Sequence, residues 1–223
     1  MLKAIVFDLD GTLADTMPSM LKALNLMLDS YSIARIDAAK MLTFINGTIE
    51  DFVTSVLPVG IVENQVNKQK AIECYEEFYS ETYCETNKCY DGMQEVLEEL
   101  SGNHILAILS NKQQNYVDKL GRQLFRKGLF SQMLGAQIGV PGKPDPTGMR
   151  YLLAKIGVRN DEAVYIGDSD VDVITAQNAG VRSISVSWGY RSAEYLRTHG
   201  AMSVVEDPME IIRVIKSISG QRA

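Results

Sequence analysis

The stretch VFDLDGTLADT, residues 6–16, joins the end of an apolar run to a group of acidic residues. The run AIVF is followed at once by Asp8, then by Asp10 and by the pair Gly11-Thr12. A short, unbroken apolar run is typical of a strand that is covered on both faces of a parallel sheet. Open sheets of this kind bind ligands beyond the carboxyl ends of their strands. The stretch therefore predicts an α/β sheet with polar chemistry at one edge.

A helical pattern follows this strand. From Pro18 to about Tyr83, apolar residues recur at intervals of three and four, and Pro18 suits the first turn of a helix. Further helices are expected over 37–45, 49–57 and 62–83, separated by turn signals. We expect this block to be entirely helical.

After residue 90, strand-like apolar runs alternate with helical segments. This alternation predicts right-handed βαβ crossovers and a doubly wound parallel sheet. The expected strands are ILAILSN (105–111), 132–137, AVYIGDS (163–169), SISVSW (183–188) and 203–205, and the expected helices are 93–101, 113–126, 146–156, 171–179 and a C-terminal helix. We therefore expect a three-layer α/β core of residues 1–15 and 91–223, with residues 16–90 inserted as a helical cap domain.

The composition limits the classes of function. A chain of 223 residues that is 46% hydrophobic can bury a sizeable core, and its formal charge of -6 disfavours nonspecific binding to nucleic acids or anionic membranes. No apolar run approaches the roughly 18 to 20 residues of a membrane span, and the start has no signal-peptide pattern, so a cytoplasmic protein is expected. The three cysteines show neither disulfide-framework nor zinc-site spacing.

Further polar residues lie at strand ends or in the loops that follow them. They are Ser110, Asn111, Lys112, Lys143, Asp168 and Asp172. Each taken alone could be a turn residue or a helix cap, but several strand ends that agree predict one site. Carboxylates gathered at one edge repel one another unless a cation neutralises them, and oxygen ligands without His or Cys suit a hard ion such as Mg²⁺.

A hard cation with lysine, hydroxyl and amide donors describes a site for a phosphoryl group. There is no GxxxxGK[ST] loop, and no GxGxxG follows the first strand, so the sequence favours neither a nucleotide P-loop nor a dinucleotide site. The catalytic group would have to be a carboxylate. The expected partner is a small-molecule phosphate ester, and the pattern leaves the oligomeric state open.

Four motifs, in order along the chain, resemble those of the haloacid dehalogenase superfamily of phosphohydrolases. They are DLDGT (8–12), LSN (109–111), GKPDP (142–146) and GDSDVD (167–172). The phosphoglycolate phosphatase-like branch is the most similar, through DGTLADTMPSMLKALN (10–25), NGT (46–48) and GDSDVDVITAQNAG (167–180) with SVSWGYRS (185–192). The resemblance also implies a Rossmann-like core with a helical cap inserted after the first motif.

This resemblance implies a role for each motif residue. Asp8 would attack phosphorus and become an aspartyl phosphate, which divides one difficult displacement into two. Asp10 would protonate the departing alkoxide and then deprotonate the hydrolytic water. Gly11, which has no Cβ, would let backbone N–H groups approach the phosphoryl group.

The remaining candidates would bind the metal and the substrate. Mg²⁺ would be held by Asp8, by the main-chain carbonyl of Asp10 and by Asp168, with Asp172 supporting either the metal or Lys143. The phosphoryl oxygens would be held by Ser110, Asn111 and Lys143. The inter-helix loop Asn46, Gly47 and Thr48 offers candidates for substrate contact, although an ordinary turn explains it equally well.

Several alternative functions remain open at this point. Dehalogenases and phosphonatases resemble the core but lack an acid at the position of Asp10, so the acid favours phosphate-ester chemistry. A sugar-phosphate mutase would carry an arginine shortly after a glycine resembling Gly47, where this chain has Thr48, Ile49 and Glu50. A pyrophosphatase on the same core and a noncatalytic phosphate-sensing module are further alternatives.

Overall fold

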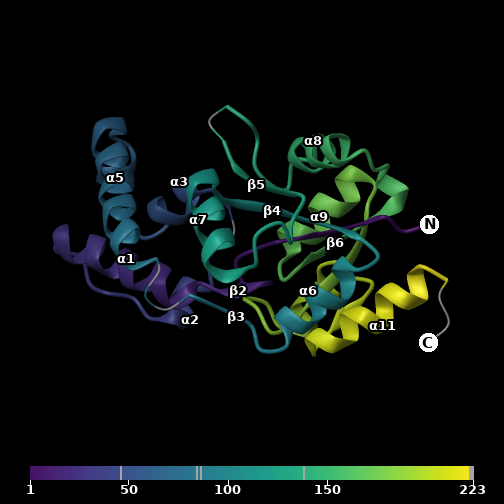
Figure 1. Ribbon diagram of the computed structural model, residues 1–223. Coiled ribbons are helices and arrows are strands. Elements are labelled where there is room, and N and C mark those ends of the chain that lie inside the picture. The colour runs from purple at the N-terminus through teal and green to yellow at the C-terminus, as the bar shows by residue number, and fades with distance from the viewer. Residues whose placement is uncertain (46, 84, 86, 138, 221–223) are drawn as a thin grey trace. The chain divides into compact units, whose positions relative to one another are not determined.

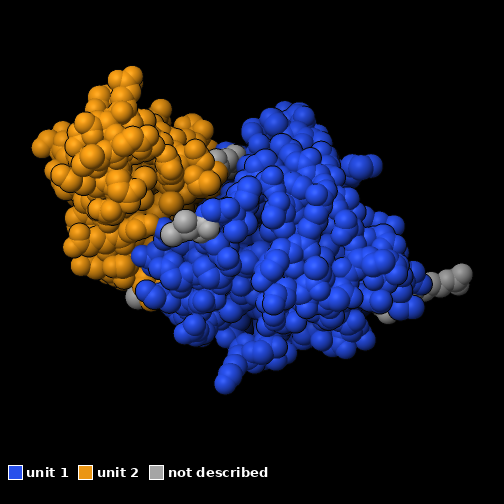
Figure 2. All heavy atoms as spheres, turned by 90° about the horizontal axis from the view of Figure 1, so that it is seen from above, with its two compact units in different colours: residues 1–14, 89–223 blue, residues 15–88 orange. Residues whose placement is uncertain are grey.

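The computed structural model describes residues 1–45, 47–83, 85, 87–137 and 139–220. The chain forms two compact units. One comprises Met1–Ala14 and Cys89–Ala223, and the other comprises Asp15–Lys88; Figure 2 colours them blue and orange. The candidate residues at the carboxyl edge of the sheet, described below, belong to the first unit.

The first unit is built on a six-stranded sheet in the order β5-β4-β1-β6-β7-β8. Its strands are β1 (Ala4–Phe7), β4 (Ile105–Gln113), β5 (Gln132–Ala136), β6 (Ala163–Gly167), β7 (Arg182–Val186) and β8 (Val204–Val205). All five neighbouring pairs run parallel. All four β1 residues are fully buried, which explains their unbroken apolar run. The prediction of a parallel, doubly wound sheet is confirmed.

Helices cover both faces of this sheet (Figure 1). They are α6 (Met93–Ser101), α7 (Gln114–Leu124), α8 (Thr147–Ile156), α9 (Asp170–Ala179), α10 (Ala193–Thr198) and α11 (Pro208–Ile218). Helices α8 and α9 pack on one face in a single buried cluster with Val6, Leu109 and Tyr165. Helix α6 contacts both β4 and α11, and in Figure 1 α6 and α11 lie on the face opposite α8. The sheet is therefore the middle of three layers.

The second unit is helical. Its helices are α1 (Met17–Ser30), α2 (Ala38–Met41), α3 (Ile49–Thr54), α4 (Val59–Val62) and α5 (Gln65–Thr82). Helix α5 packs against α1, α3 and α4. Pro18 lies in the first turn of α1, as its sequence pattern predicts.

Several element boundaries differ from the expected ranges. The helix expected over 62–83 begins at Gln65, because the Asn64 side chain accepts hydrogen bonds from the N–H groups of Val66 and Asn67 and caps α5. Val62 is instead the last residue of α4, which was not expected. The helices expected over 37–45 and 49–57 are shorter than predicted. Helix α10 and the two-stranded sheet of β2 (Ala14–Asp15) and β3 (Lys88–Cys89) were not anticipated. Within the described ranges, no helix combines the length and apolarity that crossing a membrane requires.

Candidate active site

Three buried carboxylates meet at the carboxyl edge of the sheet. Asp8 directly follows β1, Asp168 directly follows β6, and Asp172 lies in the first turn of α9. Because β1 and β6 are paired neighbours, their ends bring Asp8 and Asp168 together. One carboxylate oxygen from each residue lies within 4.8 Å of the others, and all three residues are at least nine-tenths buried.

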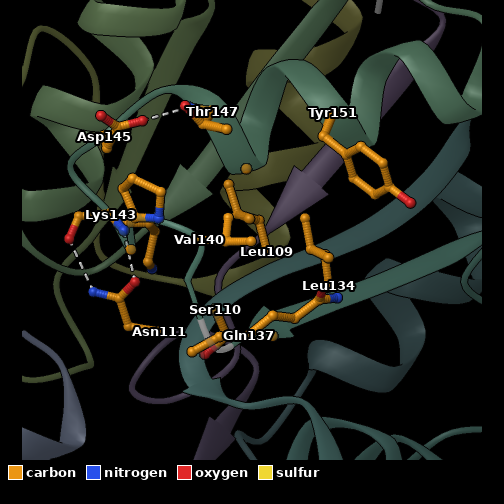
Figure 3. A pocket seen from close by; sticks show the side chains of 15 residues that line it. Leu109, Ser110, Asn111, Leu134, Gln137, Val140, Lys143, Asp145, Thr147 and Tyr151 are labelled. Atoms are coloured by element: carbon orange, nitrogen blue, oxygen red, sulfur yellow. Dashed lines mark hydrogen bonds between the residues drawn. The ribbon is translucent and has the colours of Figure 1, made fainter.

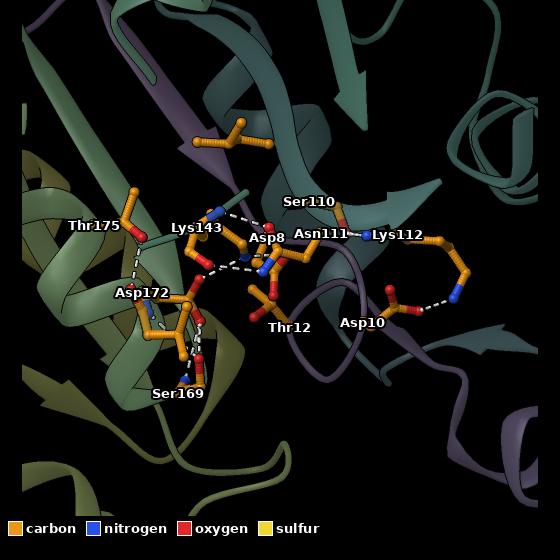
Figure 4. Close-up of polar contacts among 12 residues, drawn as sticks. Asp8, Asp10, Thr12, Ser110, Asn111, Lys112, Lys143, Ser169, Asp172 and Thr175 are labelled. Carbon is orange, nitrogen blue, oxygen red and sulfur yellow. Dashed lines mark hydrogen bonds and ion pairs between the residues drawn. The ribbon is translucent and has the colours of Figure 1, made fainter. Parts of the chain in front are cut away.

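Lys143 supplies the positive charge for this cluster (Figure 4). Its ammonium nitrogen lies 2.9 Å from Asp8 Oδ1 and donates a 2.7 Å hydrogen bond to Asp172 Oδ1. It also donates to the Tyr165 hydroxyl at 3.0 Å. Asp8 Oδ1 is an ion-pair partner of the ammonium, but no donor among the described residues is aligned to form a hydrogen bond with it. The Lys143 ammonium therefore holds the nucleophile candidate through its charge.

Burial and mutual repulsion change the protonation of these groups. Burial raises the pKa of Asp8 to about 7; Lys143 opposes this shift, and the Asp172 and Asp10 charges add to it. Burial, then the Asp172 and Asp8 charges, hold the pKa of Asp168 well above its usual range. The pKa of Lys143 is raised, because burial, which lowers it, is outweighed by Asp172 and Asp8. One lysine therefore does not neutralise the three carboxylates, so the donor set fits an additional hard cation.

The Asp168 carboxylate is held from two sides. Its Oδ1 accepts a 3.0 Å hydrogen bond from the Thr12 hydroxyl, and its Oδ2 accepts a 2.7 Å bond from the Tyr190 N–H. A Cβ on Gly11 would lie 2.3 Å from Asp168 Oδ2, and Gly11 has φ +79°. A Cβ on Gly189 would lie 2.2 Å from the Gly11 carbonyl oxygen. Glycine is therefore required at both positions for the two loops to approach each other.

Trp188 links the loop that contains Gly11 and Thr12 to the loop that contains Gly189. Its indole Nε1–H donates a 3.1 Å hydrogen bond to the Thr12 carbonyl, across 176 residues of sequence, and its ring lies beside Tyr90. The Trp188 side chain and the Tyr190 backbone therefore both donate hydrogen bonds on the Asp168 side of the site.

Trp188→Phe is expected to lower the free energy of unfolding by about 1 kcal/mol or more, because phenylalanine remains aromatic but is smaller than tryptophan and leaves the buried Thr12 carbonyl without its donor. Urea unfolding followed by circular dichroism measures this change. Tyr151→Phe is the matched control, because Tyr151 is exposed and only its hydroxyl is removed. Equal unfolding free energies for Trp188→Phe and the control would contradict the assigned role of the indole N–H.

The two carboxylate oxygens of Asp172 have different partners, one set at the start of α9 and the other in the site. Its Oδ2 accepts hydrogen bonds from the Ser169 N–H and hydroxyl, which completes the capping box of α9. Its Oδ1 accepts from Lys143 at 2.7 Å and from the Tyr165 hydroxyl at 2.8 Å. A Cβ on Gly167 would lie 2.4 Å from Asp172, so close packing also fixes this carboxylate. These contacts favour support of Lys143 among the roles considered for Asp172.

The end of β4 carries the second group of candidates. Between Leu109 and Gln113 the register with β5 shifts, and such an irregularity redirects side chains. The buried Ser110 hydroxyl accepts a hydrogen bond from the Lys112 N–H at 3.2 Å. The Asn111 amide accepts from the Lys143 N–H at 2.7 Å and donates to the Lys143 carbonyl at 3.0 Å. Asn111 therefore positions the loop that carries Lys143.

Asp10 lies apart from the three buried carboxylates. Its Oδ1 accepts a 2.8 Å hydrogen bond from the Lys112 ammonium, and both side chains are largely buried. In Figure 4 this pair lies on one side of Asp8, and Lys143 and Asp172 lie on the other. The two aspartates of the first motif thus have different lysine partners.

The remaining cap candidates belong to the second unit. Thr48 is the N-cap of α3, where it forms a capping box with Asp51, and Gly47 has φ +148° with little room for a Cβ beside Asp51. These features are those of a turn leading into a helix. Asn46 lies outside the described residues.

A cavity of about 230 Å³ adjoins the loop of Lys143 (Figure 3). Ser110, Asn111 and Lys143 form one wall, and Leu134 and Tyr151 are among its mostly apolar remaining residues. None of the three clustered carboxylates lines it. The cavity therefore adjoins the three residues expected to hold the phosphoryl oxygens but is not lined by the carboxylates.

The chain matches one protein family over most of its length. The model of the haloacid dehalogenase-like hydrolases matches residues 5–186, which contain all four motifs. The chain belongs to this family. The prediction of a phosphatase of the haloacid dehalogenase superfamily is confirmed at this level.

Similar proteins carry phosphatase names. The chain is 29% identical to a phosphoglycolate phosphatase of Haemophilus influenzae strain 86-028NP over 194 residues, which cover 84% of this chain and 87% of that protein. It is 26% identical to the phosphoglycolate phosphatase of a second strain of that species, over 96% of this chain and 98% of the relative. A solved structure of a predicted phosphoglycolate phosphatase from Haemophilus somnus is 25% identical, with a TM-score of 0.86 over 96% and 98% of the two chains.

Proposed function

We propose that this member of the haloacid dehalogenase-like hydrolases is a Mg²⁺-dependent phosphatase of small phosphate monoesters, and that 2-phosphoglycolate is among its substrates. The observation that carries the proposal is the placement of Lys143 between Asp8 and Asp172, beside Asp168. A phosphoryl group and a hard cation both fit a site with this combination of charges.

In the proposed first step, an Asp8 carboxylate oxygen attacks phosphorus and the P–O bond to the leaving group breaks. Lys143 neutralises charge on the phosphoryl oxygens, and the Ser110 hydroxyl is a further donor. Asp10 gives its proton to the departing alkoxide oxygen. In the second step, Asp10 takes a proton from water, the water oxygen attacks phosphorus, and Asp8 is released with inorganic phosphate.

The Mg²⁺ ion would be held by Asp8, the Asp10 carbonyl and Asp168. When bound, it would neutralise the buried carboxylates and charge on the phosphoryl oxygens. Thr12 and Tyr190 would hold Asp168 in place, and Asp172 would hold Lys143. We also propose that the helical unit, Asp15–Lys88, acts as a cap that excludes bulk water and selects the leaving group.

The test is inorganic phosphate release, with kcat/KM measured for a panel of 2-phosphoglycolate, pyrophosphate, sugar phosphates and nucleoside monophosphates. The proposal expects Mg²⁺-dependent release from monoesters, with 2-phosphoglycolate among the good substrates. No release from any monoester, or full activity after thorough chelation, would overturn it. Conversion of a hexose phosphate without net phosphate release would instead favour a mutase.

The pKa of Asp8 gives a prediction for the metal-free protein. Because its folded-state pKa is raised from 3.8 to about 7, folding favours its protonated form. The free energy of unfolding should therefore fall as the pH rises from about 4 to about 7. Mg²⁺ should offset this loss, so it should raise the melting temperature more at pH 8 than at pH 5.

Differential scanning calorimetry at the two pH values, with and without Mg²⁺, measures this effect. The matched variant Asp8→Asn has no ionisable group at position 8, so the part of the pH dependence that Asp8 supplies should disappear. An equal Mg²⁺ effect at pH 5 and pH 8 in the unmodified protein would contradict the prediction.

A further inference from the structure

The Lys112–Asp10 ion pair brings a second lysine into the site, distinct from Lys143. The Lys112 side chain is only 7% exposed, and its ammonium nitrogen lies 2.8 Å from Asp10 Oδ1. Lys143 contacts Asp8 and Asp172 instead. The site therefore places one lysine beside the proposed nucleophile and another beside the proposed acid.

The position of Asp10 indicates which part of a substrate lies near Lys112. An acid that protonates the departing alkoxide must come within hydrogen-bond reach of that oxygen. An ammonium group 2.8 Å from the acid is then close to the atoms attached to the alkoxide oxygen, away from the phosphoryl group. A carboxylate bonded directly to the carbon that carries the alkoxide oxygen would be within reach of this ammonium.

The buried positive charge of Lys112 favours such a carboxylate. Its ammonium nitrogen lies 2.8 Å from Asp10 Oδ1, and a hydrogen bond between an ammonium and a carboxylate is stronger than one between neutral groups. A carboxylate of the leaving group in contact with Lys112 would hold the alkoxide oxygen beside Asp10.

We propose that Lys112 recognises a carboxylate on the leaving group and so makes the enzyme selective for phosphate esters of small 2-hydroxy acids. This inference rests on the proposed phosphatase function, and it adds a residue of the first unit to the selection of the leaving group. Lys112 is in this account a specificity-determining residue, and its partner on the substrate is the carboxylate rather than the phosphoryl group.

The test compares two esters that differ in one group. In 2-hydroxyethyl phosphate, a hydroxymethyl group replaces the carboxylate of 2-phosphoglycolate, while the phosphoryl group is the same. The unmodified enzyme should have at least a tenfold higher kcat/KM for 2-phosphoglycolate, as expected for about one charged hydrogen bond. In Lys112→Met the ratio of the two kcat/KM values should fall about tenfold to a hundredfold.

Two further variants sharpen the comparison. Lys112→Arg keeps the positive charge and should retain part of the selectivity. Lys127→Met removes an exposed lysine and should keep the original ratio. A ratio that stays within about twofold of the original in Lys112→Met, with both kcat/KM values lowered together, would show that Lys112 only positions Asp10 and would overturn the proposal.

A second measurement does not depend on the folding of any variant. Glycolate should competitively inhibit hydrolysis of 2-hydroxyethyl phosphate by the unmodified enzyme, whereas ethylene glycol at the same concentration should not. Equal inhibition by the two compounds, or a preference for 2-hydroxyethyl phosphate over 2-phosphoglycolate, would overturn the proposal. Failure of the phosphatase function itself has a different result, which is no phosphate release from any ester.

Discussion

Asp8→Asn is expected to reduce steady-state phosphate release by a factor of about 10⁴ or more, because an amide oxygen cannot replace the carboxylate as a nucleophile. The measurement is the initial rate of phosphate release at saturating Mg²⁺ and substrate. The fold is expected to survive, because asparagine has nearly the same shape and removes a charge whose burial is unfavourable.

The stability of this variant separates loss of chemistry from loss of structure. In metal-free protein at pH 8, the melting temperature of Asp8→Asn should equal or exceed that of the unmodified chain, since Lys143 still pairs with Asp172. Asp161→Asn, at an exposed aspartate, is the matched control and should keep full activity. Activity of Asp8→Asn close to that of the control would exclude Asp8 as the nucleophile.

Lys143→Met is expected to lower kcat/KM by about 10²-fold to 10³-fold, because the phosphoryl oxygens lose a buried cationic donor. The ammonium also lowers the pKa of Asp8, so its removal should raise that pKa further. Because Asp8 must be ionised to attack, the rise of activity with pH should move to higher pH. The full pH profile of kcat/KM measures both effects.

The control for Lys143→Met is Lys127→Met, which removes an exposed lysine with the same substitution. It should leave both the rate and the pH profile unchanged. If Lys143→Met retained activity within about threefold of the control, Lys143 would not bind the phosphoryl group. A lower rate with an unchanged pH profile would contradict its effect on Asp8.

The sheet could be predicted from the sequence because its strands are short, apolar and separated by helical patterns. Buried parallel strands such as Ala4–Phe7 have an unbroken apolar run, which is an unambiguous local signal. The same topology brings strand ends to one edge, so Asp8 and Asp168 could be expected to meet without knowledge of their contacts.

The residues that orient the site could not be predicted in the same way. Tyr165 lies inside a buried strand and has the pattern of a core residue, yet its hydroxyl contacts Lys143 and Asp172. The Trp188 indole and its acceptor at Thr12 are 176 residues apart. Their roles depend on the side to which each polar atom points, and residue spacing carries no information on that direction.

The start of α5 also depends on the direction of a polar side chain, so the sequence pattern did not predict it. Helix α5 begins at Gln65 rather than at residue 62, because the Asn64 side chain accepts hydrogen bonds from backbone N–H groups at its start. The apolar spacing did not mark this start, because it does not report on the side-chain cap. Lys112 was visible in the sequence beside Asn111, but its pairing with Asp10 appears only when β1 and β4 lie next to each other.

The central claim is that Asp8 carries the phosphoryl group during turnover. The most direct measurement is to quench the enzyme during hydrolysis of 2-phosphoglycolate, reduce any acyl phosphate with borohydride, and analyse the peptide that contains residue 8 by mass spectrometry. The account predicts that the Asp8 side chain is reduced to the corresponding alcohol in a substrate-dependent manner. An unmodified Asp8 in an enzyme that is releasing phosphate, with reduction at another carboxylate, would contradict it.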